Sequence, residues 1–381
     1  MRWFVSLLLL LLLVVPASAL GSVGDSRILL AEGILGELKG DGPGMAALQD
    51  AATWYPAYPR AVIDSAGVMT TLYRPADRII VMNSDAADAI SVLGIDDRVV
   101  GVGDVIPTRP LQFPTMTGVQ SIGKYNEPDI EAIMALRPDL LISYVLWPDA
   151  EKLDRHLPDR IGIVKLDFYK ADAFRDELST LAHITGTSDA ATEYIEWYDG
   201  IQTLVNERIS RVPDDERARV FIDYGSGRTT GRRTMAEGTG LHDIVTAAGG
   251  INVAAGYVTG YADVENEWVI KERPDLVLIW SPKGGYVPGE EDLFREARDD
   301  LMTMPGFGNI PAIRDDEVYV ISSAFGFGSS SPVAVLRVAM LLYPDEFADI
   351  DFNEVHQEYF SRFTQSDEEI RTLGTFYYPE R

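Results

Sequence analysis

Cysteine is absent from this chain of 381 residues. Disulfide bonds, thiolate zinc sites and cysteine nucleophiles are therefore excluded. A membrane tether through a lipid-modified cysteine is excluded as well. Any retention at a membrane has to come by another route.

Histidine is scarce too, and the four residues are His156, His183, His242 and His356. None of them lies at the end of a predicted strand. His242 belongs to a predicted helix, where packing accounts for it. Zinc sites commonly combine several imidazoles or thiolates with a carboxylate. We therefore predict no directly bound metal and no resident cofactor.

Positive charge is in short supply, because 33 basic residues face 59 acidic ones and the net charge is −26. Such a surface repels the phosphates of nucleic acids and anionic lipids, so we expect neither as a partner. Solubility alone accounts for most of this charge equally well.

Enzyme motifs are lacking: the sequence contains no G-x-S-x-G, H-E-x-x-H or P-loop. "GVGD" at 101–104 is too short a glycine pattern to indicate dinucleotide binding. We therefore do not expect an enzyme. An exported α/β enzyme that uses paired carboxylates, or a surface-attached scaffold protein, remains the alternative.

One long hydrophobic run exists, at the N-terminus. Met1-Arg2 precedes an apolar stretch from Trp3 to Val15, and Ala17-Ser18-Ala19 supplies the small-x-small pattern of a cleavage site. This order predicts a signal peptide over 1–19 and an exported, extracytoplasmic protein. An uncleaved anchor is the alternative. Residues 20–57 read as a leader segment.

The rest of the chain alternates predicted strands and helices, which indicates α/β lobes with mostly parallel sheets. The chain is too long for one ordinary core. We predict a first lobe over 58–170 and a second over 214–381. Residues 171–213 read as helix almost throughout and should join the lobes at a nearly fixed angle.

A ten-residue frame occurs once in each predicted lobe: "EAIMALRPDL" from Glu131 and "EWVIKERPDL" from Glu267. Arg-Pro-Asp-Leu reads as the end of a helix followed by a buried strand, since proline disfavours helix in the residue before it. In the first copy we expect Asn126 to cap the helix and Pro128 to stand in its first turn. Neither packing nor the turn requires the leading glutamates, so a matched pair facing solvent suggests a two-point docking surface.

These segments together resemble a known family, the class III substrate-binding proteins of ABC importers, which serve ferric siderophores, haem and cobalamin. The resemblance runs from about Tyr58 to Phe347. It rests on the order and spacing of "YPRAVIDSAG", "ADRIIVMNSDAADAISVLGIDDRVVGVGD", "EPDIEAIMALRPDLLIS", "GTGLHDIVTAAGGINVA", "NEWVIKERPDLVLIWS" and "MPGFGNIPAIRDDEVYVI".

The resemblance implies two Rossmann-like lobes joined by a single long α-helix, with the ligand cleft between the lobes. It implies a monomer that captures an iron- or cobalt-containing organic chelate and delivers it to the permease dimer of an ABC importer. One surface glutamate per lobe pairs with permease arginines in this family, and Glu131 and Glu267 match those positions. Arginine–carboxylate pairs are geometrically exacting, so two of them would fix the docking orientation.

Ligands of open α/β sheets bind outside the carboxyl ends of the strands. Aromatic residues gather at these predicted ends and suit a large flat or chelated ligand. Arg228, Arg232 and Arg233 in a Gly/Thr-rich loop suit an anionic ferric chelate, a propionate or a phosphate, unless the loop is merely a solvated hairpin tip. Arg228 follows its strand most closely. The residues we expect to contact ligand are Asp104, Tyr144, Trp147, Tyr224, Arg228, Arg232, Trp280, Tyr286 and Phe325.

Overall fold

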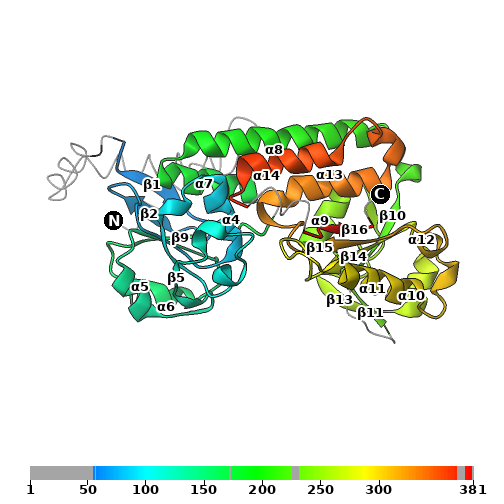
Figure 1. Ribbon diagram of the computed structural model, residues 1–381, viewed down its shortest axis with the longest axis horizontal. Helices are drawn as coiled ribbons and strands as arrows, with labels where there is room; N and C mark the ends of the chain where they lie inside the picture. The colour runs from blue at the N-terminus through cyan, green and yellow to red at the C-terminus, as the bar shows by residue number, and fades with distance from the viewer. Residues whose placement is uncertain (1–54, 56, 171–172, 225–230, 367–373, 380–381) are drawn as a thin grey trace, which may run out of the picture.

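A computed structural model describes residues 55, 57–170, 173–224, 231–366 and 374–379. The predicted signal peptide, nearly all of the leader segment and Arg228 lie outside the described residues. Two α/β lobes stand side by side, and α8 (Ser188–Ile209) runs across both of them (Figure 1). This confirms the predicted architecture of two lobes joined by one long helix.

The first lobe is built on a five-stranded parallel sheet in the order β5-β4-β3-β8-β9. Its central strands are short and almost wholly apolar, and β3 and β8 are buried on both faces, as expected for a parallel sheet covered by helices. The antiparallel hairpin β1–β2 lies beside the sheet. The strands are β1 (Arg60–Ile63), β2 (Met69–Leu72), β3 (Ile79–Val81), β4 (Val99–Val102), β5 (Gln120–Ser121), β6 (Gly123–Lys124), β7 (Glu127–Pro128), β8 (Leu140–Ser143) and β9 (Gly162–Lys165).

The second lobe holds a seven-stranded sheet in the order β13-β11-β10-β14-β15-β16, with β12 paired to β10. Strands β10, β14 and β15 run parallel, whereas β11, β13 and β16 add antiparallel edges. The strands are β10 (Arg219–Asp223), β11 (Gly231–Met235), β12 (Ile251–Asn252), β13 (Tyr261–Glu265), β14 (Leu276–Ser281), β15 (Val318–Ser322) and β16 (Tyr377–Tyr378).

Helices cover both sheets. Those of the first lobe are α4 (Ser84–Val92), α5 (Ile130–Leu136) and α6 (Ala150–Asp154), and α7 (Phe174–Thr185) leads into α8. Those after α8 are α9 (Gly240–Ala247), α10 (Asn266–Glu272), α11 (Glu291–Met302), α12 (Pro311–Arg314), α13 (Ser331–Leu342) and α14 (Phe352–Phe363). Among the described residues, no helix is both long enough and apolar enough to cross a membrane.

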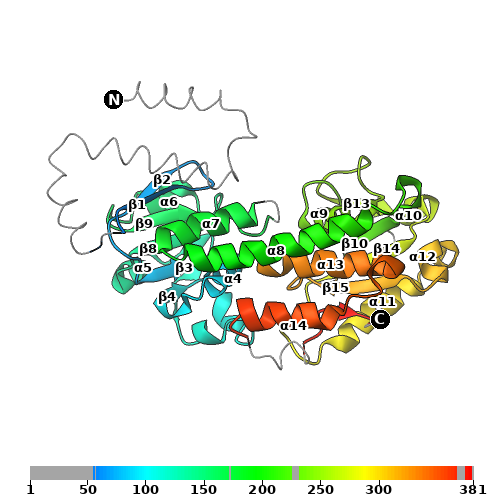
Figure 2. The same cartoon turned by 90° about the horizontal axis from the view of Figure 1, so that it is seen from above.

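Helix α8 is fixed by aromatic and polar contacts along its length. Seen from above, α13 and α14 lie beside it (Figure 2). The hydroxyl of Tyr194, near its first end, donates to the carbonyl of Ser329 at 2.7 Å. Trp197 stacks on Tyr359 of α14 with ring centroids 5.9 Å apart. Near its last end, Arg208 holds Asp349 through two hydrogen bonds of 2.6 and 2.8 Å. The lobes are thus joined by a packed helical layer, and not by a bare connection.

The repeated Arg-Pro-Asp frame has the same geometry in both lobes. Helices α5 and α10 end at an arginine in the left-handed conformation, with φ of 46° at Arg137 and 50° at Arg273. The aspartate that follows the proline then accepts a backbone N–H from the neighbouring strand segment: Arg78 donates to Asp139 at 3.1 Å, and Arg219 donates to Asp275 at 2.9 Å.

The side chain of the donor residue completes the frame. The guanidinium of Arg78 donates to the carbonyl of Leu136 at 2.8 and 3.0 Å, and that of Arg219 donates to the carbonyl of Glu272 at 3.1 Å. Both bonds satisfy a carbonyl left open at the end of a helix. The prediction that Arg-Pro-Asp-Leu ends a helix and starts a buried strand is confirmed.

The expected helix starts need correction. In α5 the cap is Asp129, whose side chain accepts the N–H of Ala132 at 3.0 Å, and not Asn126. Pro128 belongs to the short strand β7, because the segment before α5 pairs with β6 and leaves no room for an earlier helical turn. In α4 the cap is Asn83.

Candidate ligand site between the lobes

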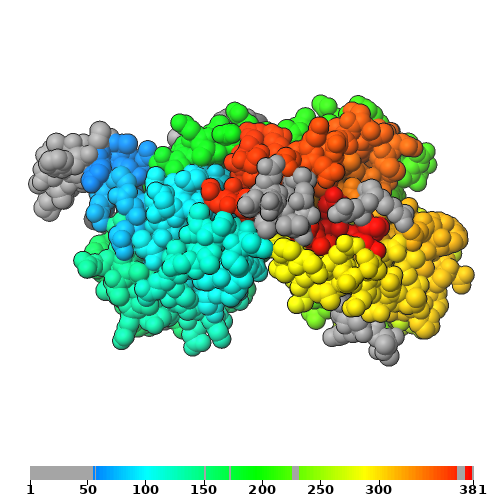
Figure 3. All heavy atoms as spheres, in the orientation of Figure 1, coloured from blue at the N-terminus to red at the C-terminus, as the bar shows by residue number. Residues whose placement is uncertain are grey.

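A cavity of about 470 Å³ lies between the two lobes. In the space-filling view the lobes diverge on the side away from α8 (Figure 3). The first lobe contributes α4 and the segment after β4, and the second contributes the segments after β14 and β15. The lining residues are Ser84, Asp85, Asp88, Thr108, Arg109, Pro110, Leu111, Gln112, Pro282, Gly284, Tyr286, Val287, Pro288, Ser323, Ala324 and Phe327.

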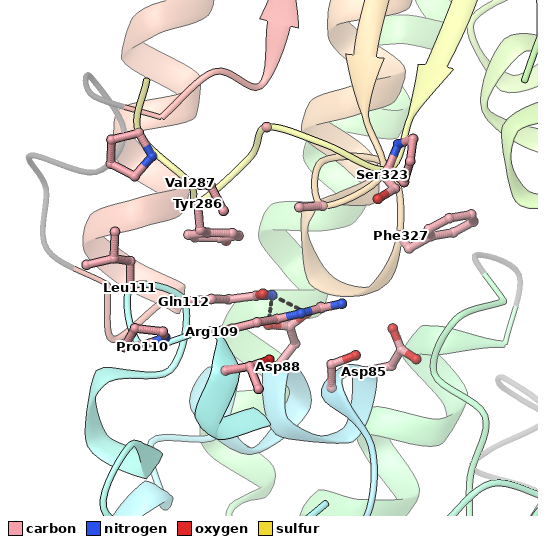
Figure 4. A pocket seen from close by; sticks show the side chains of 16 residues that line it. Asp85, Asp88, Arg109, Pro110, Leu111, Gln112, Tyr286, Val287, Ser323 and Phe327 are labelled. Atoms are coloured by element: carbon pink, nitrogen blue, oxygen red, sulfur yellow. Dashed lines mark hydrogen bonds between the residues drawn. The ribbon is translucent and has the colours of Figure 1, made fainter. Parts of the chain in front are cut away.

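Helix α4 places two acids in this cavity. It follows directly on β3, and Asn83 caps it by accepting the N–H of Ala86 at 2.8 Å. Its alanines and Ile90 are buried against the lobe. Asp85 and Asp88 stand three positions apart on the remaining face, since residues at this spacing share one side of a helix. Figure 4 shows both side chains directed toward the segments that carry Tyr286, Ser323 and Phe327.

Asp88 is the more strongly perturbed of the two acids. Gln112 donates to its two oxygens at 3.1 and 3.4 Å. Burial, together with the neighbouring charge of Asp85, raises the pKa of Asp88 to about 8, although Gln112 and Arg109 act in the opposite direction. Near neutral pH this carboxyl is therefore largely protonated, and it is able to donate as well as accept a hydrogen bond.

Asp85 accepts a hydrogen bond from a tyrosine at the end of the sheet. The hydroxyl of Tyr144, just beyond β8, donates to Asp85 Oδ2. Burial raises the pKa of Asp85, while the hydrogen bond from Tyr144 and the guanidinium of Arg109 partly counteract this. Arg109 lowers the pKa of Asp85 and of Asp88 alike, so one guanidinium serves two acids.

Tyr144 also belongs to a group of four rings, Tyr125, Tyr144, Trp147 and Tyr169, which we name the aromatic cluster. Its ring packs edge to face against the other three, with centroids 5.6, 6.3 and 5.8 Å away. Tyr125 and Trp147 are 41% and 45% exposed, so much of their apolar area is free to cover a ligand.

The second lobe faces this cluster with a pair of tyrosines. Tyr224 and Tyr261 contact edge to face at 5.8 Å. Tyr169 of the first lobe contributes to the raised pKa of Tyr261, so the two groups are close enough to interact across the gap between the lobes. These rings of the two lobes stand beside the cavity, and none of the six belongs to its lining.

The structure distributes the other predicted ligand residues among three environments. Tyr286 lines the cavity. Trp280 and Phe325 are 3% and 1% exposed: Trp280 packs on Phe327 at 4.9 Å, and Phe325 packs in the core of the second lobe among α14 and β16. Asp104 is exposed at the surface and does not belong to the cavity lining.

The predicted basic loop has a different structure from the one we expected. Arg232 and Arg233 lie in strand β11, which pairs with β10 and β13, and only 225–230, with Arg228, fall outside the described residues. Arg232 is 3% exposed and forms a bidentate pair with Asp223, itself fully buried. Arg233 lies over the ring of Tyr224 at 5.8 Å. Asp223 neutralises Arg232, so its charge is not available to a ligand.

Sequence reasoning missed Asp88, Arg109, Gln112, Tyr125 and Tyr169. A signal for Asp88 was present, because "SDAADA" places two acids three apart opposite an alanine face. Arg109 and Gln112 follow the strand β4 after a short 3₁₀ turn and carry no motif. Among the described residues, no group of three or more histidines or acids is placed to hold a metal ion.

Comparison with known proteins decides the family. A family model described as "Periplasmic binding protein" matches residues 79–324, well over half of the chain. The chain belongs to this family. The match takes in both copies of the repeated frame and most of the cavity lining.

Individual relatives are distant. The molybdate-binding protein MolA of Haemophilus influenzae is 22% identical over 66% of this chain and 74% of its own. A cobalamin-binding protein of Halobacterium salinarum is 29% identical over 58% of each chain. The crystal structure of the TroA-like periplasmic binding protein FepB from Veillonella parvula superposes with a TM-score of 0.69 and 18% identity, covering 83% of this chain and 98% of that one. This last likeness shows the shared fold.

In this periplasmic binding protein the two leading glutamates of the frame face solvent, as the sequence indicated. Glu131 in the first turn of α5 and Glu267 in the first turn of α10 are both exposed. Figure 1 shows α5 and α10 on different lobes, both on the side away from α8. The two carboxylates thus stand at corresponding places of the two lobes.

Proposed function

We propose that this periplasmic binding protein captures an iron- or cobalt-containing organic chelate between its lobes and delivers it to the permease dimer of an ABC importer. The proposal places the protein outside the cytoplasm, with transport and not catalysis as its role. The observation that carries it is the cavity between the lobes, with the aromatic cluster beside it. Exposed rings on both sides of a cleft suit a large ligand with flat or apolar faces.

Two distant relatives agree with this ligand class by name, one binding cobalamin and another Fe(3+)-citrate. The contacts we propose for ligand are Tyr144, Trp147, Tyr224 and Tyr286. Arg228 keeps its place as a sequence-based candidate. Arg232, Trp280 and Phe325 are buried and Asp104 is exposed outside the cavity lining, so we do not propose them as ligand contacts.

We further propose that Glu131 and Glu267 pair with basic residues of the permease. Both are exposed acids on short helices that the repeated frame fixes in the same way. Two charge pairs far apart on a rigid body determine orientation more than one pair does, and they speed encounter at low salt. Their removal should therefore affect delivery and leave capture of the ligand unchanged.

Binding and turnover separate this function from an enzymatic one. The full chain is titrated with cyanocobalamin, haem, a ferric hydroxamate and ferric citrate, and quenching of tryptophan fluorescence reports binding. We expect saturable one-to-one binding of one class of chelate, recovered chemically unchanged. Conversion of the chelate, or no binding of any of the four, contradicts the proposal.

A further inference from the structure

We infer that Asp85, Asp88 and Arg109 make the cavity selective for an uncharged chelate whose rim carries amide or hydroxyl groups, over a chelate that carries carboxylates. The inference rests on the proposed function and specifies the ligand class of the same site. It is carried by the charges and hydrogen-bonding groups that line the cavity.

The lining offers an anion little to bind. Among the described lining residues two are acids and one is a base. The single guanidinium, Arg109, is already flanked by both acids, whose pKa values it lowers. A carboxylate of the ligand that approaches Arg109 therefore also approaches Asp85. A like charge about 6 Å away weakens binding by roughly a hundredfold at an effective dielectric constant of about 20, which cancels most of the attraction of Arg109.

Three other cations near the cleft are paired or lie outside the cavity lining, and Lys283, exposed between two lining residues, does not itself belong to the lining. Arg232 is buried with Asp223, and Lys170 beside Tyr169 donates to Asp167 at 2.6 Å. Arg233 lies over the ring of Tyr224 and does not belong to the cavity lining. Within the described part of the chain, the second lobe thus brings no uncompensated positive charge into the cavity lining.

Amides match this lining better than carboxylates do. An amide group has both a donor and an acceptor. Gln112 supplies both kinds of atom, and Asp88, with its raised pKa of about 8, offers a carboxyl that donates and accepts near neutral pH. Arg109 donates and Asp85 accepts. A ring of amides on an uncharged chelate is able to satisfy these groups, while carboxylates would leave the acceptors without partners.

The test uses one pair of probes that differ only in their rim groups: cyanocobalamin, and the same corrinoid with its rim amides hydrolysed to carboxylates. A neutral ferric hydroxamate and ferric citrate form a second pair. Dissociation constants of the full chain are measured at pH 7.5 by fluorescence quenching. In each pair that binds, we expect the dissociation constant of the uncharged member to be at least about tenfold lower than that of the anionic member. Equal or tighter binding of the anionic member overturns the inference, yet leaves the proposed function intact.

Variants show whether these residues cause the preference. The double change Asp85→Asn and Asp88→Asn should reduce the preference by about tenfold. It removes the charge of Asp85, which opposes an anion, and the carboxyl of Asp88, which both donates to and accepts from an amide. Arg109→Gln should move the preference the other way. Asp97→Asn, at an exposed acid close by in sequence, should leave it unchanged. An unaltered preference in the double variant with a cooperative unfolding transition overturns the inference. Failure of every chelate to bind the unmodified protein contradicts the proposed function itself.

Discussion

Arg137 and Arg273 occupy the same position in the two copies of the repeated frame, and both have left-handed backbone conformations, with φ of 46° and 50°. Residues other than glycine rarely adopt this backbone conformation, because their Cβ atom comes too close to the following carbonyl oxygen. Each lobe therefore carries a small local strain where its helix α5 or α10 ends. Because the strain recurs in both lobes, the frame is a structural unit. Its conformation does not depend on the side chains of the two arginines.

Glycine at these positions should be tolerated or favourable. Glycine adopts positive φ without steric cost, although it also raises the entropy of the unfolded chain. We expect Arg137→Gly and Arg273→Gly each to change the free energy of unfolding by between zero and about +1 kcal/mol. Urea denaturation measures this. A loss of more than about 1 kcal/mol would show that the guanidinium itself has a structural role.

The frame aspartates should differ in importance. Asp139 is buried and accepts the N–H groups of Asp77 and Arg78 at 3.2 and 3.1 Å, whereas Asp275 is exposed and accepts the N–H of Arg219. We expect Asp139→Ala to lower the free energy of unfolding by about 2–4 kcal/mol and Asp275→Ala by about 1 kcal/mol, because buried donors lose their partners in the first variant. Equal losses from the two substitutions in urea denaturation would contradict this account.

Whether the aromatic cluster contacts the ligand is tested at Trp147. Trp147 is 45% exposed, so its removal costs the fold little. We expect Trp147→Ala to weaken binding of the chelate about tenfold, equivalent to about 1.4 kcal/mol. The matched control is Tyr257→Ala, which removes an aromatic ring that is 60% exposed and stacks on Trp268, outside the aromatic cluster. Equal affinities of the two variants for the chelate would show that the aromatic cluster does not contact it.

Asp88 makes stability depend on pH. Below about pH 4 its carboxyl is protonated in both the folded and the unfolded chain. Between about pH 4 and its folded pKa of about 8, only the folded chain keeps the proton, so stability falls as pH rises through this range. Asp85 and Asp96 raise the pKa of Asp88, whereas Gln112 and Arg109 lower it. The charge of Asp88 in turn raises the pKa values of Tyr194, Tyr286 and Tyr359.

We therefore expect Asp88→Asn to stabilise the ligand-free protein by roughly 1–3 kcal/mol at pH 9, and to have little effect at pH 4. Asparagine keeps the size of the side chain and cannot ionise. Thermal unfolding across this pH range measures the difference. A stabilisation that is the same at pH 4 and pH 9, or that is larger at pH 4, would contradict the assigned ionisation of Asp88.

Docking is tested by charge reversal. We expect Glu131→Arg together with Glu267→Arg to reduce uptake by the cognate importer at least about tenfold, while the affinity for the chelate stays unchanged. The control reverses two exposed acids of α8, Glu196 and Glu207, on the side of the molecule away from α5 and α10. Unchanged uptake in the first double variant, or an equal loss of uptake in the control, would contradict the docking proposal.

Much of the fold could be predicted because it follows from local pattern. The apolar runs Leu140–Ile142 and Leu276–Trp280, the 22-residue amphipathic α8 and the prolines after Arg137 and Arg273 determine their conformations from nearby residues alone. The same holds for the exposure of Glu131 and Glu267, since each lies on a helical face opposite to buried apolar residues.

The candidate site was less predictable because it depends on pairing between distant segments. Arg232 reads as a loop cation in the sequence, yet β11 pairs with β10 and brings it onto Asp223. Asp88 and Gln112 meet only because the segment after β4 folds over α4. Neither the register of an antiparallel edge strand nor the path of a loop is fixed by the few residues that form it.

One measurement tests the central claim most directly: native mass spectrometry with a visible absorption spectrum, on protein recovered from its own source. We expect a single chelate per chain, with the mass and absorption of an uncharged iron or cobalt complex. Protein that carries no chelate and binds none when they are added would contradict the account, as would protein that converts the chelate to another compound.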